Sequence, residues 1–141
     1  MTRQNIADAT METNHLASTR QALQQVLDQS ATAWNAGDLD GFMESYVPSA
    51  QIAYVSGEHL VRGYDAIRAM YAERFGAGCG AGTMGQLSLQ MLDLHLLGPR
   101  HAHVLGRFHL VTAQDALAQG YTSLVFEQAA DGWKILQDHS G

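Results

Sequence analysis

At 141 residues, 46% of them hydrophobic, the chain is long enough for one domain that buries roughly two-thirds of its unfolded surface. This composition excludes disorder for most of the chain. The formal net charge is −6 and the eight Lys and Arg residues are spread thinly, which excludes a basic surface for nucleic acid or for an anionic membrane.

The sequence also indicates where the protein resides. No apolar run is long enough to span a bilayer, and the N-terminal stretch "MTRQNIADATMETN" lacks the apolar core of a signal peptide. The single cysteine, Cys79, cannot form an internal disulfide. A reducing cytoplasm is therefore the expected location.

The N-terminal part of the chain predicts a tail followed by a helix. Residues 1–14 are polar and without periodicity, so we expect a flexible tail ahead of a single domain over residues 15–141. Apolar residues then recur at helical spacing and predict an amphipathic helix that ends at "NAGD". Gly37 can supply its left-handed C-cap, and Asp38 can cap the next helix.

Several short elements follow. The stretch "LDGFMESYV" predicts a second helix that Pro48 stops, and "AQIAYVSG" and "EHLVRG" predict two short strands. A third helix is expected from Tyr64 to Phe75. The next ten residues, "GAGCGAGTMG", contain five glycines. They predict a plain surface loop, or a pocket lid, rather than a phosphate-binding loop, because no Gly-Lys-Ser/Thr follows.

The last third of the chain predicts four long strands. These are "QLSLQMLDLHLL", "HAHVLGRFHLVT", "GYTSLVFEQA" and "WKILQDHS", with a Gly-Pro turn after the first and an Asp-Gly hairpin turn before the last. Helices followed by an antiparallel meander predict an α+β fold with the helices on one face of the sheet.

The order of these motifs resembles the NTF2-like superfamily. The resemblance spans residues 15–141 and rests on "AWNAGDLDGFMESY", "RGYDAIRAMYAERF" and the final meander. Within it, "VLGRFHL" and "GWKILQDHS" are most similar to the SnoaL-like branch, also called DUF4440. The resemblance implies a cystatin-like cone in which three N-terminal helices pack on a strongly curved, mostly antiparallel sheet. It does not imply one function, because steroid isomerases, polyketide cyclases and the association domain of calmodulin-dependent kinase share the fold.

The resemblance allows the steroid isomerases to be compared position by position. The stretch "NAGDLDG" is similar to the corresponding part of that branch. Its oxyanion tyrosine then falls on Ser30, its carboxylate base on Tyr54, and its oxyanion acid near Ser123 or Leu124. A tyrosine hydroxyl cannot replace a carboxylate base near neutral pH, because it titrates at about 10. We therefore expect this chain not to be a steroid isomerase.

The resemblance also implies a conical cavity, and strand alternation suggests which residues face it. Arg107 and His109 share one face of their strand. Arg107 either anchors an anionic or carbonyl group in the cavity or pairs with Asp138 or Glu127, and His109 is expected to be satisfied by the backbone. Aromatic side chains can form a wall around a flat ligand. The candidates for lining the pocket or binding the ligand are Trp34, Tyr54, Tyr71, Phe75, Arg107, His109, Tyr121, Ser123, Asp138 and His139.

These candidates are not supported equally. Tyr54 occupies a position that the resembling family uses for chemistry, whereas Phe75 is expected in the plain core. Asp138 and His139 are neighbours in a strand and face opposite sides unless a bulge intervenes. The alternation that follows Trp133 favours His139 toward the cavity and leaves Asp138 to tie the strand to Arg107 or to the dimer partner.

The sequence gives little indication of a metal site or of a catalytic nucleophile. His101 and His103 form a His-x-His pattern, but no third ligand with zinc-like spacing is evident. No residue near Cys79 would lower its pKa, and no catalytic triad is recognisable. We therefore expect no metal and no cofactor.

Two classes of function fit these observations. The first is a protein that binds a small apolar ligand, either as a plain binder or as an isomerase, cyclase or hydratase of a hydrophobic carbonyl compound. The second is a non-catalytic binding or oligomerisation module. In either class, apolar residues on both faces of the long strands favour a homodimer through the sheet face.

Overall fold

The computed structural model describes residues 2–77, 85–112 and 117–141, with the side chains of the first helix described from residue 14. Cys79 and most of the predicted glycine-rich loop lie outside the described residues. None of the described helices is long and apolar enough to cross a membrane.

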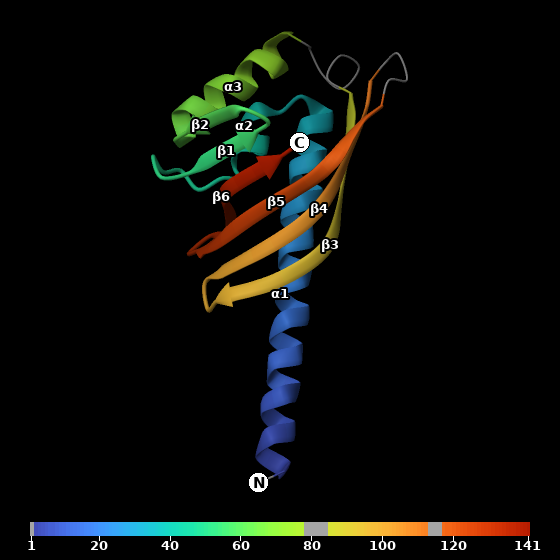
Figure 1. Ribbon diagram of the computed structural model, residues 1–141, viewed down its shortest axis with the longest axis vertical. Coiled ribbons are helices and arrows are strands. Elements are labelled where there is room, and N and C mark those ends of the chain that lie inside the picture. Colours follow the sequence, from blue (N-terminus) through green and yellow to red (C-terminus); the bar gives the residue numbers. More distant parts are fainter. Residues whose placement is uncertain (1, 78–84, 113–116) are drawn as a thin grey trace.

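The described residues form three helices, α1 (Thr2–Ala36), α2 (Leu39–Met43) and α3 (Tyr64–Ala77), of which the third follows the first two strands. The caps between α1 and α2 match the sequence prediction, since Gly37 has a φ of +71° and the Asp38 carboxylate accepts a hydrogen bond from the Gly41 N–H at 3.0 Å. The start of α1 differs from the prediction. Its backbone is helical from Thr2, because no glycine or proline interrupts residues 2–36. Figure 1 shows this N-terminal part extending away from the sheet; its flexibility in solution stays a prediction.

The six strands form one sheet in the order β2-β1-β6-β5-β4-β3. All neighbouring pairs are antiparallel except β1 and β6, which run parallel. The predicted α+β class with a mostly antiparallel sheet is therefore confirmed, and the last strand of the chain lies inside the sheet. The strands are β1 (Ala53–Ser56), β2 (His59–Arg62), β3 (Gln86–Gly98), β4 (His101–Val111), β5 (Leu117–Ala129) and β6 (Gly132–Ser140).

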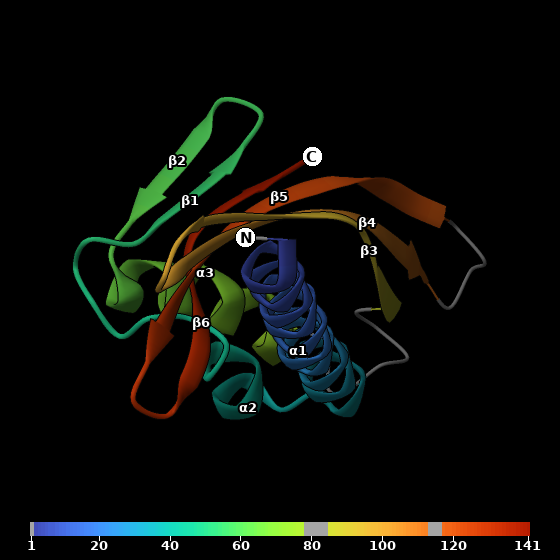
Figure 2. The same cartoon turned by 90° about the horizontal axis from the view of Figure 1, so that it is seen from below.

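The sheet curves around the helices, which all lie on its concave side (Figure 2). Two side chains at the C-terminal end of α1 attach this helix to the start of β3. The Asn35 amide donates to the Leu87 carbonyl at 3.0 Å and accepts from the Leu87 N–H at 2.7 Å. The Trp34 indole N–H donates to the Gly85 carbonyl at 3.2 Å. The helix end and the sheet edge are thus fixed to each other.

The segment after α2 joins the sheet instead of continuing the helix. The Ile135 N–H donates to the Ser45 carbonyl at 2.6 Å, and the Val47 N–H donates to the Ile135 carbonyl at 2.9 Å. These bonds explain why α2 is shorter than the predicted stretch "LDGFMESYV". They also place Tyr46, which lies between Ser45 and Val47, directly beside β6.

The strand β6 contains a bulge that changes which residues face the helices. Its pairing with β5 runs Phe126 to Ile135 and then Val125 to Gln137, so one extra residue stands in β6. Trp133 and Ile135 are buried before the bulge, and Asp138 is buried after it. A one-residue insertion exchanges the two faces of every later residue. Asp138 therefore faces inward, and His139 faces outward.

Candidate functional site

A cavity of about 140 Å³ lies between the helices and the concave face of the sheet. Its walls are mainly apolar and aromatic, with a few hydroxyl groups, one carboxyl group and one guanidinium group. The lining residues are Leu27, Ser30, Trp34, Phe42, Tyr46, Tyr54, Tyr71, Arg74, Leu87, Leu89, Phe108, Leu110, Thr122, Leu124, Ile135, Asp138 and Ser140.

An aromatic cluster forms the helical wall of the cavity. The ring centroid of Phe42 lies 4.8 Å from that of Tyr71 and 5.5 Å from that of Trp34, with the rings near edge-to-face. Tyr54 extends this wall from β1, with its ring centroid 5.9 Å from that of Tyr71. Such contacts fix each ring in one orientation and stabilise the wall beyond simple burial. Phe75 packs against Trp34 at 5.4 Å but is not among the lining residues, which agrees with its expected place in the core.

The carboxyl group of Asp138 is the buried acid of the cavity. Its side chain is 5% exposed and its two oxygens accept hydrogen bonds from different donors. The Tyr46 hydroxyl donates to Oδ2 at 2.7 Å, and the Ser140 hydroxyl donates to Oδ1 at 2.6 Å. Thr122 Oγ1 lies 2.8 Å from the Ser140 oxygen and extends this polar chain along the sheet. A carboxyl group can stay in an apolar cavity because these donors replace water.

Burial decides the ionisation of this acid and of the tyrosines near it. It raises the pKa of Asp138 above the ordinary value, and the hydrogen bonds from Ser140 and Tyr46 oppose that rise without cancelling it. Burial also raises the pKa of Tyr46 and of Tyr71 well above 10, with the charge of Asp138 as the next cause for both. The two phenols therefore keep their protons at neutral pH and act as hydrogen-bond donors rather than bases.

The sheet supplies the opposite wall. Phe108 faces the cavity from β4, and Gly120 on the paired strand leaves the space that its ring occupies. A Cβ atom at Gly120 would lie 3.0 Å from two atoms of the Phe108 ring. Ser30, on which the resemblance placed the oxyanion tyrosine, and Leu124, one of the two positions expected for the oxyanion acid, also line the cavity. Neither carries an ionisable group, so the acid of this cavity comes from a different position.

The predicted site residues divide into those that line the cavity and those that do not. Trp34, Tyr54, Tyr71 and Asp138 line the cavity, whereas six others are absent from its lining. One of the six is Phe75, which is buried in the core, and strand pairing assigns the other five to the outer face of the sheet; they are Arg107, His109, Tyr121, Ser123 and His139. This placement corrects the expectation that Arg107, His109 and His139 lie at the polar end of the cavity. The bulge in β6 is the reason for His139.

Arg107 and Ser123 have other partners on that outer face. The Arg107 guanidinium carbon lies 4.6 Å from the ring centroid of Tyr121, a cation–π contact that replaces both ion pairs considered from the sequence. Ser123 Oγ lies 2.7 Å from His103 Nε2. These contacts hold outer-face side chains to each other, so none of them reaches the concave side.

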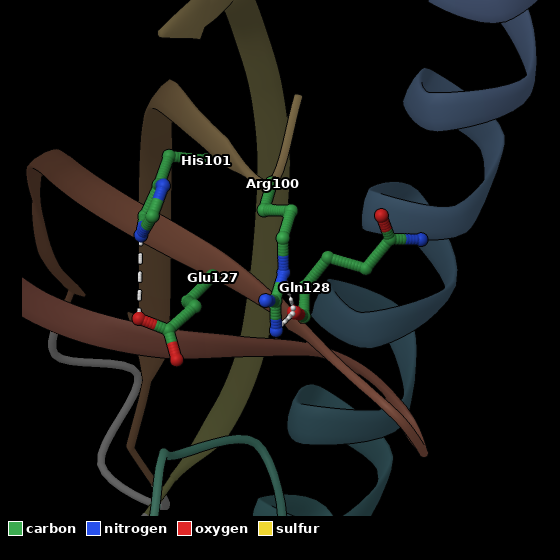
Figure 3. Close-up of polar contacts among 4 residues, drawn as sticks. All are labelled: Arg100, His101, Glu127 and Gln128. Carbon is green, nitrogen blue, oxygen red and sulfur yellow. Dashed lines mark hydrogen bonds and ion pairs between the residues drawn. The ribbon is translucent and has the colours of Figure 1, made fainter. Parts of the chain in front are cut away.

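The two histidines of the His-x-His pattern contact side chains of the neighbouring strand β5. His101 Nε2 lies 3.2 Å from Glu127 Oε2, and next to this pair Arg100 donates two hydrogen bonds to the Gln128 carbonyl, at 3.3 and 3.1 Å (Figure 3). These contacts fasten the β3–β4 turn to β5. Among the described residues, no group of three or more His, Cys, Asp or Glu side chains could hold a metal ion.

Several site residues were not predicted from the sequence, and Tyr46, Ser140 and Arg74 are the ones that matter most for the chemistry. Tyr46 lies in the apolar stripe expected for the second helix, and its hydroxyl was the one indication that this stripe contacts a polar group. Ser140 and Arg74 gave no comparable indication. Ser140 is the penultimate residue, and the expected alternation, broken by the bulge, does not pair it with Asp138.

The fold and the cavity together define a class of protein: a cone-shaped α+β domain whose curved sheet and helices enclose an apolar pocket. The sequence model of the SnoaL-like domain matches residues 23–140. The chain therefore belongs to the SnoaL-like family, within the NTF2-like fold. No curated protein shows a significant sequence match to the chain.

Solved structures resemble the whole domain. An NTF-2 like protein of unknown function from Shewanella oneidensis is 28% identical, with a TM-score of 0.78, over 86% of this chain and 97% of that one. A cystatin-like domain of unknown function from Nostoc punctiforme is 16% identical, with a TM-score of 0.72, over 87% and 76%. A candidate calcium/calmodulin-dependent protein kinase type II association domain from Thiobacillus denitrificans is 18% identical, with a TM-score of 0.68, over 83% and 91%. The last two resemblances show the fold alone.

Proposed function

We propose that this protein binds a small hydrophobic carbonyl compound in its cavity and moves a proton on that compound through Asp138. The observation that carries this proposal is a buried carboxyl group in the wall of an otherwise apolar cavity. Groups whose pKa is perturbed by burial in a pocket are frequent in catalytic sites. A raised pKa also brings a carboxyl group nearer to the range in which it can both accept and return a proton at neutral pH.

The arrangement supports transfer of a proton between two carbons of an enolisable compound. The ionised Asp138 takes a proton from a carbon next to the carbonyl group, and the electron pair of that C–H bond moves toward the carbonyl oxygen. A hydroxyl group stabilises the charge that develops on this oxygen. Tyr71 and Tyr54 are candidates for this donor, because the Tyr46 hydroxyl already donates to Asp138. When a carbon–carbon double bond of the compound is conjugated with this enolate, Asp138 returns the proton to the far carbon of that double bond, the double bond moves next to the carbonyl group, and the product is an isomer.

Exchange of ligand protons with deuterated solvent tests this proposal. Phenylacetone, a hydrophobic ketone with one ring, is incubated with the protein in heavy water, and loss of its α-proton signals is followed by NMR. We expect the wild-type protein to accelerate the loss and Asp138→Asn to abolish the acceleration while ketone binding persists. His139→Asn is the matched control, since it alters the neighbouring residue on the opposite face. Equal rates with wild type and Asp138→Asn would contradict the proposal.

A second candidate function is assembly through the outer face of the sheet. This face exposes large apolar side chains at the ends of β4 and β5, where Val111 is 41%, Leu117 53% and Tyr121 56% exposed. Val111 pairs with Leu117 across the two strands, so these side chains are contiguous. A second copy of the chain would cover them, and the resemblance to an association domain supports this interpretation. A homodimer of this kind is compatible with a ligand in the cavity on the other face.

Light scattering coupled to size-exclusion chromatography tests the homodimer. The wild-type protein is expected to elute with twice the mass of the chain, and Leu117→Glu to elute as a monomer, because a charge at the centre of an interface is costly to bury. Leu16→Glu is the control, since Leu16 is exposed on α1, away from the outer face. A monomeric wild-type protein at micromolar concentration would rule the assembly out.

A further inference from the structure

Arg74 is the positively charged side chain in the cavity wall. It lies in the last turn of α3, and its guanidinium carbon is 5.0 Å from the centroid of the Trp34 ring. Arg74 is exposed to solvent, whereas Asp138 is buried. The two charged groups of the wall therefore differ in exposure: the cation meets solvent, which we call the open end of the cavity, and the acid is enclosed.

The guanidinium group of Arg74 is available to a ligand. No carboxylate pairs with it among the described residues, whereas Arg68, six residues earlier on the same helix, pairs with Asp40. A cation–π contact engages the charge of the guanidinium group with the ring and leaves its N–H groups able to form hydrogen bonds with a ligand. Two of these N–H groups can bind one carboxylate in a bidentate arrangement. The cation–π contact with Trp34 favours a position of the group beside the cavity wall.

The size of the cavity limits the apolar part of a ligand. At about 140 Å³, it matches the engineered apolar cavities of about 150 Å³ that bind benzene. It is smaller than most pockets for drug-sized ligands, which begin near about 300 Å³. One ring fits between the aromatic wall and the sheet, and four fused rings do not.

We infer that the ligand is a small acid with a single ring, whose ring fills the cavity and whose carboxylate is bound by Arg74 at the open end. This inference rests on the proposed use of the cavity as a ligand site and specifies the class of compound. The ring lies against Trp34 and Tyr71 on one side and Phe108 on the other. The carbon chain of the acid spans from the ring to Arg74.

Calorimetric titration with three matched compounds tests both parts of the inference. Phenylacetate carries one ring and a carboxylate, phenylacetamide is its neutral counterpart of nearly equal shape, and 2-naphthylacetate adds a second ring. We expect the wild-type protein to bind phenylacetate about tenfold more tightly than either of the others. Chemical shifts of the Trp34 indole N–H locate the bound ring, because this group lies at the cavity wall.

Substitution of Arg74 distinguishes the contribution of its charge to ligand affinity from the contribution of its packing against Trp34. Arg74→Met removes the charge and keeps an apolar side chain over Trp34, so affinity for phenylacetate should fall about tenfold while affinity for phenylacetamide stays within about twofold. Arg68→Met, on the same helix but outside the cavity wall, should change neither affinity. Equal wild-type affinity for acid and amide, or an equal loss of both in Arg74→Met, would overturn the assignment of the carboxylate to Arg74.

The outcomes distinguish this inference from the function on which it rests. If phenylacetone is bound and its protons exchange but phenylacetate shows no preference over its amide, the inference fails and the proposed function stands. If phenylacetate binds through Arg74 but Asp138→Asn exchanges ketone protons as fast as the wild type, the ligand class stands and the proton transfer fails. Tighter binding of 2-naphthylacetate than of phenylacetate would refute the single-ring limit.

Discussion

Replacing Tyr46 with Phe removes one hydroxyl group from the cavity and leaves the ring in place. The hydroxyl donates to Asp138 at 2.7 Å, and both side chains are buried. The ring of residue 46 packs against Phe42 at 6.0 Å and Tyr71 at 6.4 Å, contacts that phenylalanine retains. The substitution therefore removes the hydrogen bond to a buried carboxyl group, together with the contact of this hydroxyl with that of Tyr71.

The cost of this substitution depends on the ionisation of Asp138. A hydrogen bond to a charged group contributes about 1.5–3 kcal/mol, whereas one between neutral groups contributes about 0.5–1.5 kcal/mol. The destabilisation by Tyr46→Phe should thus be about 1.5–3 kcal/mol at a pH where Asp138 is ionised and about 1 kcal/mol less at a pH where it is neutral. The hydrogen bond lowers the pKa of Asp138, so its removal raises that pKa further.

Two measurements check these expectations. Urea-induced unfolding of the wild type and of Tyr46→Phe at pH 4 and pH 8 gives the free energy of unfolding in each state. Carbon NMR of the Asp138 carboxyl group gives its titration midpoint in both proteins. The midpoint should be higher in the variant, and the difference in stability between the two proteins should be larger at pH 8.

Tyr71→Phe serves as the matched control. Tyr71 is a second buried tyrosine of the same wall, but no hydrogen bond joins its hydroxyl to Asp138. Loss of the Tyr71 hydroxyl should change the titration midpoint of Asp138 less than loss of the Tyr46 hydroxyl does. If Tyr46→Phe is equally destabilising at both pH values and leaves the midpoint unchanged, the hydroxyl does not support the charge of Asp138 and the reasoning fails.

Three further predictions follow from other contacts. Because burial raises the pKa of Asp138, its contribution to stability is fully present below about pH 4, the range of an unfolded aspartate, and is lost as pH rises through the folded pKa. The stability of wild type relative to Asp138→Asn, measured by urea unfolding, should fall with rising pH in that window; a constant difference would contradict this. Asn35→Ala should cost about 1–3 kcal/mol, because it removes both hydrogen bonds to Leu87, and amide hydrogen exchange should show faster opening at the start of β3. Gly120→Ala should displace the Phe108 ring, destabilise the fold by about 1–3 kcal/mol and weaken phenylacetone binding; unchanged affinity would show that the ring does not limit the cavity.

The sequence predicted the elements of the fold because their patterns are local. Helical spacing marked α3 within two residues of its observed end, and the Gly37-Asp38 pair marked the boundary between α1 and α2. The Asp-Gly turn located the β5–β6 hairpin. The start of α1 was the main local error, since a polar stretch without apolar periodicity can still be helical when nothing interrupts its backbone hydrogen bonds.

The residues that line the cavity were harder to predict than the elements, because they depend on which face of the sheet each side chain lies on. Alternation correctly separated Phe108 from its neighbours Arg107 and His109, but it could not tell which of the two faces is concave. The aromatic wall was predicted in part, through Trp34, Tyr54 and Tyr71, because aromatic side chains on the inner face tend to be buried.

The sequence by itself determined the order of the elements, the α+β class and the set of aromatic and polar side chains from which a site could be built. The tertiary structure decided the acid of the cavity. Asp138 faces inward only because a bulge inserts one residue into β6, and Tyr46 reaches it only because the chain after α2 pairs with that strand. Both depend on partners about ten or more residues away along the chain, which local periodicity does not record.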